Sequence, residues 1–299
     1  MRAAFVGRFP PRPVIRRGFL ALAVVLAAFL PVAGAAAEIP VSRFFKTSDG
    51  VRLHYLEAGA GLTLLFVPGW SMPAEIWESQ LRHFSGKYRA VALDPRGQGQ
   101  SEIAAGGYTA DRRARDIQEL IDALKADPVV LVGWSLGVLE ALAYAHTYGD
   151  ARLAALVLVD NSIGEDPPPV SDPTFLARLR RDRTATLERF VRTMYRTPRD
   201  EAYYQRLTQS ALRLPLKASL ALLDSSYPRS FWRQAVYRVE KPLLYAVTPR
   251  FQGQALNLKA HRPQARIEIF EQAGHALFVD EPERFNRLLE EFLQQELAP

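Results

Sequence analysis

The chain of 299 residues contains no cysteine, which excludes disulfide bonds and thiolate chemistry. Cysteine usage therefore gives no information about the redox compartment. The chain also has no internal repeat, no low-complexity linker and no motif for a metal ion or an organic cofactor, so we expect neither metal nor cofactor. Hydrophobic residues at 48% and charged residues at 23% are ordinary for a globular protein. The length suffices for one large domain with an insertion or for two small domains.

Acidic residues are missing from segment 1–37, which carries five arginines. This segment accounts for most of the net charge of +6, because the rest of the chain holds 33 basic against 32 acidic residues. A charge confined to the first residues gives little attraction for a polyanion. We therefore expect no nucleic-acid partner.

The same segment has the layout of a secretory signal peptide. Its arginines precede an apolar run at 19–33, and Ala35-Ala36-Ala37 then forms an A-x-A cleavage site before Glu38. The run is interrupted by Pro31 and is shorter than the roughly 20 residues that span a bilayer. We expect cleavage, a periplasmic or secreted protein, and no stable membrane anchoring; a retained anchor is the alternative.

The leader also contains Arg16-Arg17-Gly18-Phe19-Leu20, which resembles the twin-arginine export motif. A protein exported by that route crosses the membrane already folded. An ordinary signal peptide with paired arginines is the other interpretation, and both stay open.

Segment 129–137 reads Val-Val-Leu-Val-Gly-Trp-Ser-Leu-Gly and contains the pattern G-x-S-x-G, with Ser135 between Gly133 and Gly137. A serine on a sharp strand-to-helix turn needs small residues two positions to either side, because the turn is tight and the helix packs closely. The apolar run before Ser135 and the helix-forming run at 138–148 supply the strand and the helix. The pattern therefore predicts a nucleophile elbow; a plain loop is the alternative.

Around this elbow, strand-like and helix-like segments alternate, which predicts a mostly parallel sheet of about eight strands with right-handed crossovers. A hairpin at 44–46 and 51–58 around Asp49-Gly50 adds an antiparallel edge. Strands are expected at 62–67, 88–93, 129–134, 154–159, 242–247 and 265–270, and helices at 73–84, 109–124, 138–148, 256–261 and 282–293.

Segment 162–240 differs from this alternating pattern, because it is polar, rich in arginine and free of strand-like runs. Helix-like stretches lie at 175–186, 187–195, 201–212 and 216–223. We interpret it as a helical cap inserted into a core formed by 38–161 and 241–299, lying over the carboxyl ends of the strands. Its arginines are interpreted as a solvated helix face, with binding of an anionic substrate or of a membrane surface as the alternative.

Five landmarks in order make the chain resemble the alpha/beta-hydrolase superfamily, in its esterase and haloperoxidase-like branch with a helical cap. They are Pro68-Gly69-Trp70, the loop 94–101, the elbow, the cap, and Gly274-His275 before the last helix. The resemblance implies a serine hydrolase with Ser135 as nucleophile and His275 as general base. It also implies an oxyanion hole made by the backbone N–H groups of Trp70 and Leu136.

The third catalytic residue departs from the family's usual pattern. Where most members carry an aspartate after the strand that follows the cap, this chain has Thr248-Pro249-Arg250-Phe251. Some relatives take the acid from the end of the strand after the elbow helix, which here is Asp160. We predict that Asp160 completes the triad, because an imidazolium formed in the reaction needs a partner. A structural turn-capping role, or replacement by Glu165 or Asp166, is the alternative.

The predicted function is cleavage of a small to medium carboxylic ester through an acyl-enzyme. Trp70 and Trp134 are expected to line an apolar pocket. A haloperoxidase-like or perhydrolase activity at the same triad, and a ligand-binding protein without catalysis, are the alternatives. The sequence does not indicate which ester is bound or whether the chain forms oligomers.

Overall fold

The computed structural model describes residues 1–5, 7–8, 10, 39–170, 172–224 and 227–297. Residues 35–299 form one unit and residues 1–34 another. The predicted apolar run and cleavage site of the signal peptide lie outside the described residues. Within the described part, no helix is both long and apolar enough to cross a bilayer.

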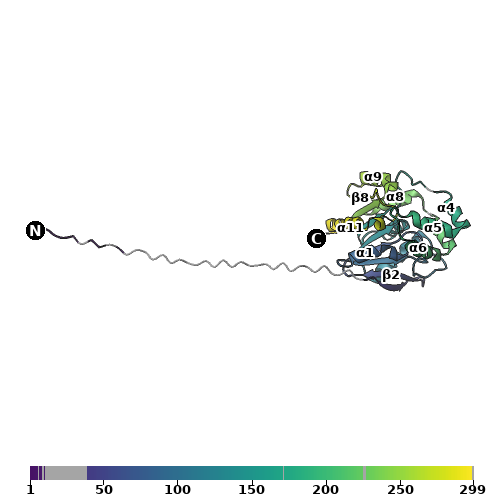
Figure 1. Cartoon of the computed structure of the whole chain (residues 1–299), viewed down its shortest axis with the longest axis horizontal. Coiled ribbons are helices and arrows are strands. Elements are labelled where there is room, and N and C mark those ends of the chain that lie inside the picture. The colour runs from purple at the N-terminus through teal and green to yellow at the C-terminus, as the bar shows by residue number, and fades with distance from the viewer. Residues whose placement is uncertain (6, 9, 11–38, 171, 225–226, 298–299) are drawn as a thin grey trace. The chain divides into compact units, whose positions relative to one another are not determined.

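An eight-stranded sheet runs through residues 35–299 in the order β1-β2-β4-β3-β5-β6-β7-β8 (Figure 1). Strands β1 and β2 form the expected antiparallel hairpin, β2 pairs antiparallel with β4, and every pairing from β4 to β8 is parallel. The predicted fold class is confirmed. The strands are β1 (Val41–Lys46), β2 (Arg52–Ala58), β3 (Thr63–Val67), β4 (Arg89–Asp94), β5 (Val129–Trp134), β6 (Leu153–Val159), β7 (Leu243–Val247) and β8 (Arg266–Ile269).

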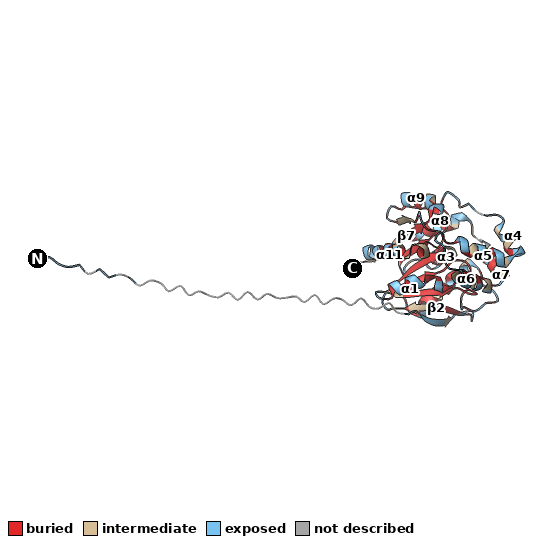
Figure 2. Cartoon of the chain, viewed as in Figure 1, coloured by how far each residue is buried: buried red, intermediate tan, exposed pale blue. Residues whose placement is uncertain are grey.

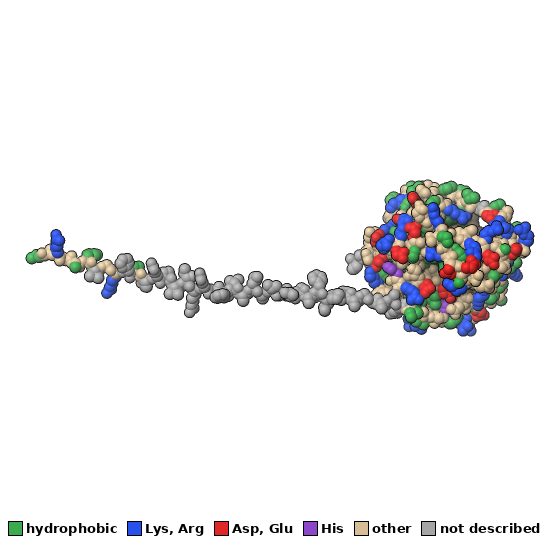
Figure 3. Space-filling model, viewed as in Figure 1, with side chains coloured by type: hydrophobic (Ala, Val, Ile, Leu, Met, Phe, Trp, Pro, Cys, Tyr) green, Lys and Arg blue, Asp and Glu red, His purple; other side chains and the backbone are tan. Residues whose placement is uncertain are grey.

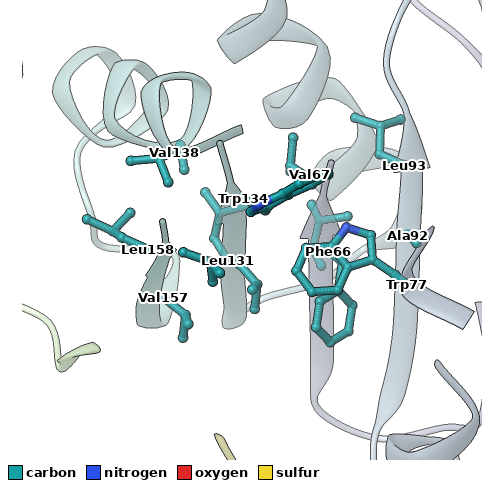
Figure 4. Close-up of a cluster of buried hydrophobic side chains, with 14 of the residues drawn as sticks. Phe66, Val67, Trp77, Ala92, Leu93, Leu131, Trp134, Val138, Val157 and Leu158 are labelled. Carbon is teal, nitrogen blue, oxygen red and sulfur yellow. The ribbon is translucent and has the colours of Figure 1, made fainter. Parts of the chain in front are cut away.

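The central strands are apolar on both faces because helices cover both sides of a parallel sheet. All residues of β3, β5 and β7 are buried. Figure 2 shows the central strands as a buried interior beneath helices whose outward faces are exposed. Side chains of β3, β4, β5 and β6 meet those of the neighbouring helices in one continuous core, part of which is drawn in Figure 4.

Helices connect the strands at nearly the predicted positions. The expected helix at 73–84 is divided, because its first turn is a 3-10 helix, η1 (Ala74–Trp77), followed by α1. A further short helix, α10, was not predicted. The helices of the core are α1 (Glu78–Phe84), α2 (Ala110–Leu124), α3 (Leu136–Tyr148), the 3-10 helix η2 (Pro249–Phe251), α9 (Gln252–His261), α10 (Leu277–Asp280) and α11 (Pro282–Leu297).

In the residues that the structure describes, five helices lie between β6 and β7 and make up most of residues 162–240, called the cap segment below. The break predicted between 186 and 187 lies instead at Asp182, whose side chain caps α5 by accepting from the N–H of Ala185. The sequence analysis missed α8, although its buried residues repeat at helical spacing. The five are α4 (Phe175–Arg181), α5 (Arg183–Thr193), α6 (Glu201–Arg213), α7 (Leu216–Leu223) and α8 (Arg229–Arg238).

The sheet changes its winding direction between β3 and β5. The chain passes from β3 to β4 on one side, whereas β5 pairs on the other side. A crevice forms at the carboxyl ends of strands at such a point. The cap segment contacts this edge, since the indole N–H of Trp70, just after β3, donates to the carbonyl of Ser219 in α7 at 2.9 Å.

Candidate active site

Ser135 occupies the sharp turn between β5 and α3, with φ 54° and ψ −122°. A Cβ at Gly133 would lie 2.3 Å from the carbonyl oxygen of Gly137, and one at Gly137 would lie 2.4 Å from that of Val67. Neither position tolerates a side chain, which explains both glycines of the motif. The backbone strain is held by neighbouring strands, because the Ser135 N–H donates to the Val159 carbonyl at 2.9 Å.

His275 lies on the loop between β8 and α10 and reaches Ser135 across the end of the sheet. Its Nε2 is 2.8 Å from Ser135 Oγ, and its Nδ1 is 2.7 Å from Asp160 Oδ2. A carboxylate can only accept, so Nδ1 carries the proton and Nε2 is free to accept from the serine hydroxyl. The structure thus joins the three side chains in one hydrogen-bonded chain.

Asp160 directly follows β6 in a left-handed backbone conformation with φ 47°, and its carboxylate is almost fully buried. Its Oδ1 accepts from Thr248 twice, from the backbone N–H at 2.7 Å and from the hydroxyl at 2.8 Å. The alternative that the carboxylate caps its own turn is therefore not what the structure has. Thr248 follows β7, so the site where relatives carry their aspartate here supplies two donors to Asp160, while Phe251 is buried in η2.

The other acids considered for the triad lie elsewhere. The carboxylate of Asp166 is 3.2 Å from the guanidinium of Arg229. Glu165 is buried beside a surface groove that it shares with Tyr237 of α8. Asp160 is the acid that the structure joins to His275.

Three contacts fix the loop that carries His275. The indole N–H of Trp134 donates to the His275 carbonyl at 2.8 Å. Asp280 accepts from the N–H of Gly274 at 2.7 Å and from the N–H of Arg196, in the cap segment, at 2.8 Å. Asp280 ends α10, and its side chain links the cap segment to this loop.

The loop after β3 approaches the serine closely. A Cβ at Gly69 would lie 2.8 Å from Ser135 Cβ and 3.3 Å from Ser135 Oγ, so only glycine leaves the hydroxyl its room. The N–H of Trp70 follows directly. Leu136 begins α3, and the first N–H groups of a helix have no helical acceptor. These two N–H groups therefore flank the serine from two elements.

Gln98, which the sequence analysis did not single out, holds the same loop. Its side-chain amide donates to the carbonyls of Gly69 at 3.0 Å and Met72 at 2.8 Å, and its oxygen accepts from the N–H of Ser71 at 3.2 Å. A buried amide with its donors and acceptor satisfied fixes its partners firmly. Its position in the loop 94–101 was the available signal, but a sequence does not show which way the side chain of a loop residue points.

Two cavities meet the catalytic side chains. The smaller, of about 260 Å³, is lined by Ser135 and Leu136 together with Trp70 and residues of α7. The larger, of about 730 Å³, is lined by His275 and residues of α4 and α5. Trp70 thus lines a cavity as expected. Trp134 does not, because it is 1% exposed and packs in the core with Phe66 and Trp77 (Figure 4).

A buried ion pair lies behind the smaller cavity. Glu140 in α3 is 2% exposed, and its Oε1 is 3.0 Å from Arg113 Nε. Burial raises the pKa of Glu140 to about 7, and burial also lowers the pKa of Arg113. Arg113 Nη2 donates to the Gln98 side chain at 3.2 Å, so the pair is connected to the loop after β3. Nothing in the sequence distinguished Glu140 from other helical glutamates.

A second Ser–His–Asp chain exists at the edge of the sheet. His54 Nε2 is 2.7 Å from Ser42 Oγ, and His54 Nδ1 is 2.7 Å from Asp94 Oδ2. Ser42 stands in the regular, exposed edge strand β1, whereas Ser135 stands on a strained turn and lines a cavity. The Asp94 carboxylate also accepts from the N–H groups of Ala74 and Gln100, which makes it a structural anchor. Only the Ser135 chain has the surroundings of an acyl-transfer site.

The fold and the hydrogen-bonded chain of Ser135, His275 and Asp160 together define an α/β protein with a Ser–His–Asp arrangement at the carboxyl ends of its strands. The model of the alpha/beta hydrolase family matches residues 64–288, and the chain belongs to this family, within its esterase and haloperoxidase branch.

Individual relatives match this chain along nearly their whole length. The chain is 26% identical over 271 residues to the AB hydrolase superfamily protein YisY of Bacillus subtilis, covering 84% of this chain and 99% of that protein. It is 30% identical to the pimeloyl-[acyl-carrier protein] methyl ester esterase of Nitrosomonas europaea, covering 78% and 96%. The crystal structure of a bromoperoxidase from Bacillus anthracis superposes with a TM-score of 0.75 at 22% identity, covering 85% and 100%, and indicates the fold alone.

Proposed function

We propose that this protein is a serine hydrolase that cleaves a small to medium carboxylic ester through an acyl-enzyme. The observation that carries the proposal is the unbroken hydrogen-bonded chain from Ser135 through His275 to Asp160, which opens on two cavities. The name of the Nitrosomonas relative, a methyl ester esterase, supports the same reaction class.

The geometry supports the following reaction. Ser135 Oγ attacks the ester carbonyl carbon while His275 Nε2 takes the hydroxyl proton, and Asp160 stabilises the imidazolium that forms. The carbonyl oxygen becomes negative and accepts from the N–H groups of Trp70 and Leu136. The ester C–O bond then breaks, and His275 returns the proton to the leaving alcohol. A water molecule, activated by His275 in the same way, releases the acid and restores Ser135.

A fluorophosphonate probe tests the proposal, because it phosphonylates, with loss of fluoride, a serine that has been activated by its surroundings. We expect labelling of Ser135 in the folded protein, its loss in Ser135→Ala, and its retention in Ser42→Ala, which removes the serine of the edge chain. Hydrolysis of p-nitrophenyl esters of rising chain length then defines the acyl size. Folded protein that is neither labelled nor active would instead support a ligand-binding protein without catalysis.

A second candidate is a haloperoxidase-like or perhydrolase activity at the same triad. It is favoured by the name of a partial relative, the non-heme chloroperoxidase of Kitasatospora aureofaciens, which is 35% identical over 38% of this chain and 42% of that protein. In this reaction hydrogen peroxide replaces water in the second half, so the product is a peracid. Bromination of monochlorodimedone that requires acetate, peroxide and Ser135 would identify it.

We also propose that residues 1–37 are removed on export, which leaves the protein in the periplasm or outside the cell. The arginines, apolar run and Ala35-Ala36-Ala37 of the sequence support this proposal. The intact mass of the exported protein tests it, since cleavage predicts a chain that begins at Glu38. A mass that includes the leader would favour an anchored protein, and Arg16-Arg17 changed to Lys-Lys separates the two export routes.

A further inference from the structure

The two cavities meet different ends of the catalytic chain, and this assigns them to different halves of an ester. The larger cavity includes His275 but not Ser135 in its lining, whereas the smaller one includes Ser135 and Leu136. In the proposed reaction His275 Nε2 gives its proton to the leaving oxygen, so the alcohol lies on the His275 side. The acyl group then extends toward the smaller cavity, of about 260 Å³ against about 730 Å³ for the alcohol.

The inner wall of the larger cavity is apolar and rigid. Phe175 of α4 and Phe190 of α5 face it together with Met194 and Leu223. Both phenylalanine rings also pack edge-on against the indole of Trp70, with centroids 5.8 and 5.3 Å away. A wall of this kind suits an aromatic or otherwise flat apolar body.

The rim of the same cavity is basic. Three arginines and one aspartate line it. Arg178 is neutralised, because its guanidinium lies 2.5 Å from the Asp172 carboxylate. Neither Arg189 nor Arg250 forms an ion pair with any residue that the structure describes. Arg250 donates one hydrogen bond, to the carbonyl of Val170 at 2.8 Å, and keeps further N–H groups for a ligand.

A solvated helix face does not account for this arrangement. Arg189 belongs to α5, whereas Arg250 belongs to η2, directly after β7, so helical spacing cannot bring them to one cavity. Two further arginines, Arg180 and Arg181, lie in the last turn of α4, and basic side chains are frequent on this side of the molecule in Figure 3. Two unpaired guanidinium groups above an apolar wall are the surroundings that a carboxylate on an aromatic body requires.

We propose that the alcohol half of the ester carries an oxyanion, such as a carboxylate, which Arg189 and Arg250 bind at the rim of the His275 cavity. The inference rests on the proposed hydrolase function and adds the substrate class to it. The preferred substrate is then an ester of a small acid with a larger, apolar and anionic alcohol or phenol.

The test compares two esters of equal size and shape, 4-acetoxybenzoate and the neutral 4-acetoxybenzamide. We expect the wild-type enzyme to favour the carboxylate in kcat/KM, and added salt to reduce this preference. In Arg189→Gln and in Arg250→Gln the preference should fall about five- to tenfold through KM, because the contact is made equally in the ground state and the transition state. Arg180→Gln is the matched control, since Arg180 is an exposed arginine of α4 outside the cavity lining.

The ratio of the two esters is measured within each variant, so a general loss of folded enzyme cancels. Turnover of both esters with a ratio unchanged by Arg189→Gln and Arg250→Gln overturns the anion site and leaves the hydrolase intact. An equal fall of the ratio in Arg180→Gln also overturns it, because the preference would then come from the overall charge of the cap segment. If neither ester is cleaved and the fluorophosphonate leaves Ser135 unmodified, the proposed function itself fails and this inference with it.

Discussion

The role of Asp160 is open to a sharp test by Asp160→Asn, because its two oxygens have separate partners. Oδ1 accepts from the backbone N–H and the hydroxyl of Thr248, and Oδ2 accepts from His275 Nδ1. An amide has only one oxygen. The Thr248 N–H can only donate, so the oxygen stays there and the amide NH2 turns toward His275.

This orientation changes which ring nitrogen of His275 carries the proton. Nδ1 must then accept, the ring proton moves to Nε2, and Nε2 can no longer take the proton of Ser135. The imidazolium also loses its negative partner. The loss of kcat expected for an aspartate-to-asparagine change in such a triad is about 10⁴-fold, or about 5 kcal/mol of transition-state stabilisation. The fold should persist, because the contacts to Thr248 remain.

The assay is hydrolysis of a p-nitrophenyl ester together with the rate of fluorophosphonate labelling, which depends on the same base. Circular dichroism and the urea midpoint verify that Asp160→Asn is folded. Thr248→Val serves as control, since it removes one donor to Oδ1 and leaves the charge and the His275 contact, so its loss should be far smaller. Turnover of Asp160→Asn within tenfold of wild type would refute the reasoning and assign the acid role elsewhere.

Three further predictions concern the surroundings of the triad. Gly69→Ala places a methyl group 2.8 Å from Ser135 Cβ and displaces the following N–H, so kcat should fall about 10²- to 10³-fold, whereas Gly106→Ala, where a Cβ meets nothing within 4 Å, should leave kcat unchanged. The pKa of Glu140 rises from 4.5 to about 7 on folding, so the free energy of unfolding should decrease by up to about 3 kcal/mol as pH rises through that window. Urea unfolding at pH 4.5 and 8 measures this difference. Glu140→Gln should abolish this contribution to the pH dependence while lowering stability overall. Trp134→Phe removes the donor to the His275 carbonyl and should cost about 1–3 kcal/mol of stability and lower kcat more than it changes KM, and an unchanged kcat would show that the loop is fixed without it.

Local pattern was enough for the elements that carry strong periodicity. The buried strands are continuous apolar runs bounded by turn residues, and the elbow is a glycine pattern between a strand and a helix, so both were predicted close to their observed positions. The division at Asp182 and helix α8 were missed, because short arginine-rich helices owe their stability to tertiary packing more than to propensity.

The site divides in the same way. Ser135 and His275 were selected by neighbouring glycines and by chain order. The role of Asp160 depends on its contact with His275, which the structure provides. Thr248, Gln98, Trp134 and Asp280 act through hydrogen bonds to other loops at the end of the sheet. No periodicity encodes such bonds, since each depends on which loops meet at the end of the sheet.

The sequence by itself determined the class of fold and the place of the elbow, because backbone strain and strand burial restrict residue type locally, and its resemblance to the alpha/beta hydrolases singled out Ser135 and His275. Only the tertiary structure decided that Asp160 faces His275, that Trp134 supports the loop from the core, and that Arg189 and Arg250 share one cavity. The physical reason is that a side chain's partners are set by packing between elements, and packing is a property of the whole fold.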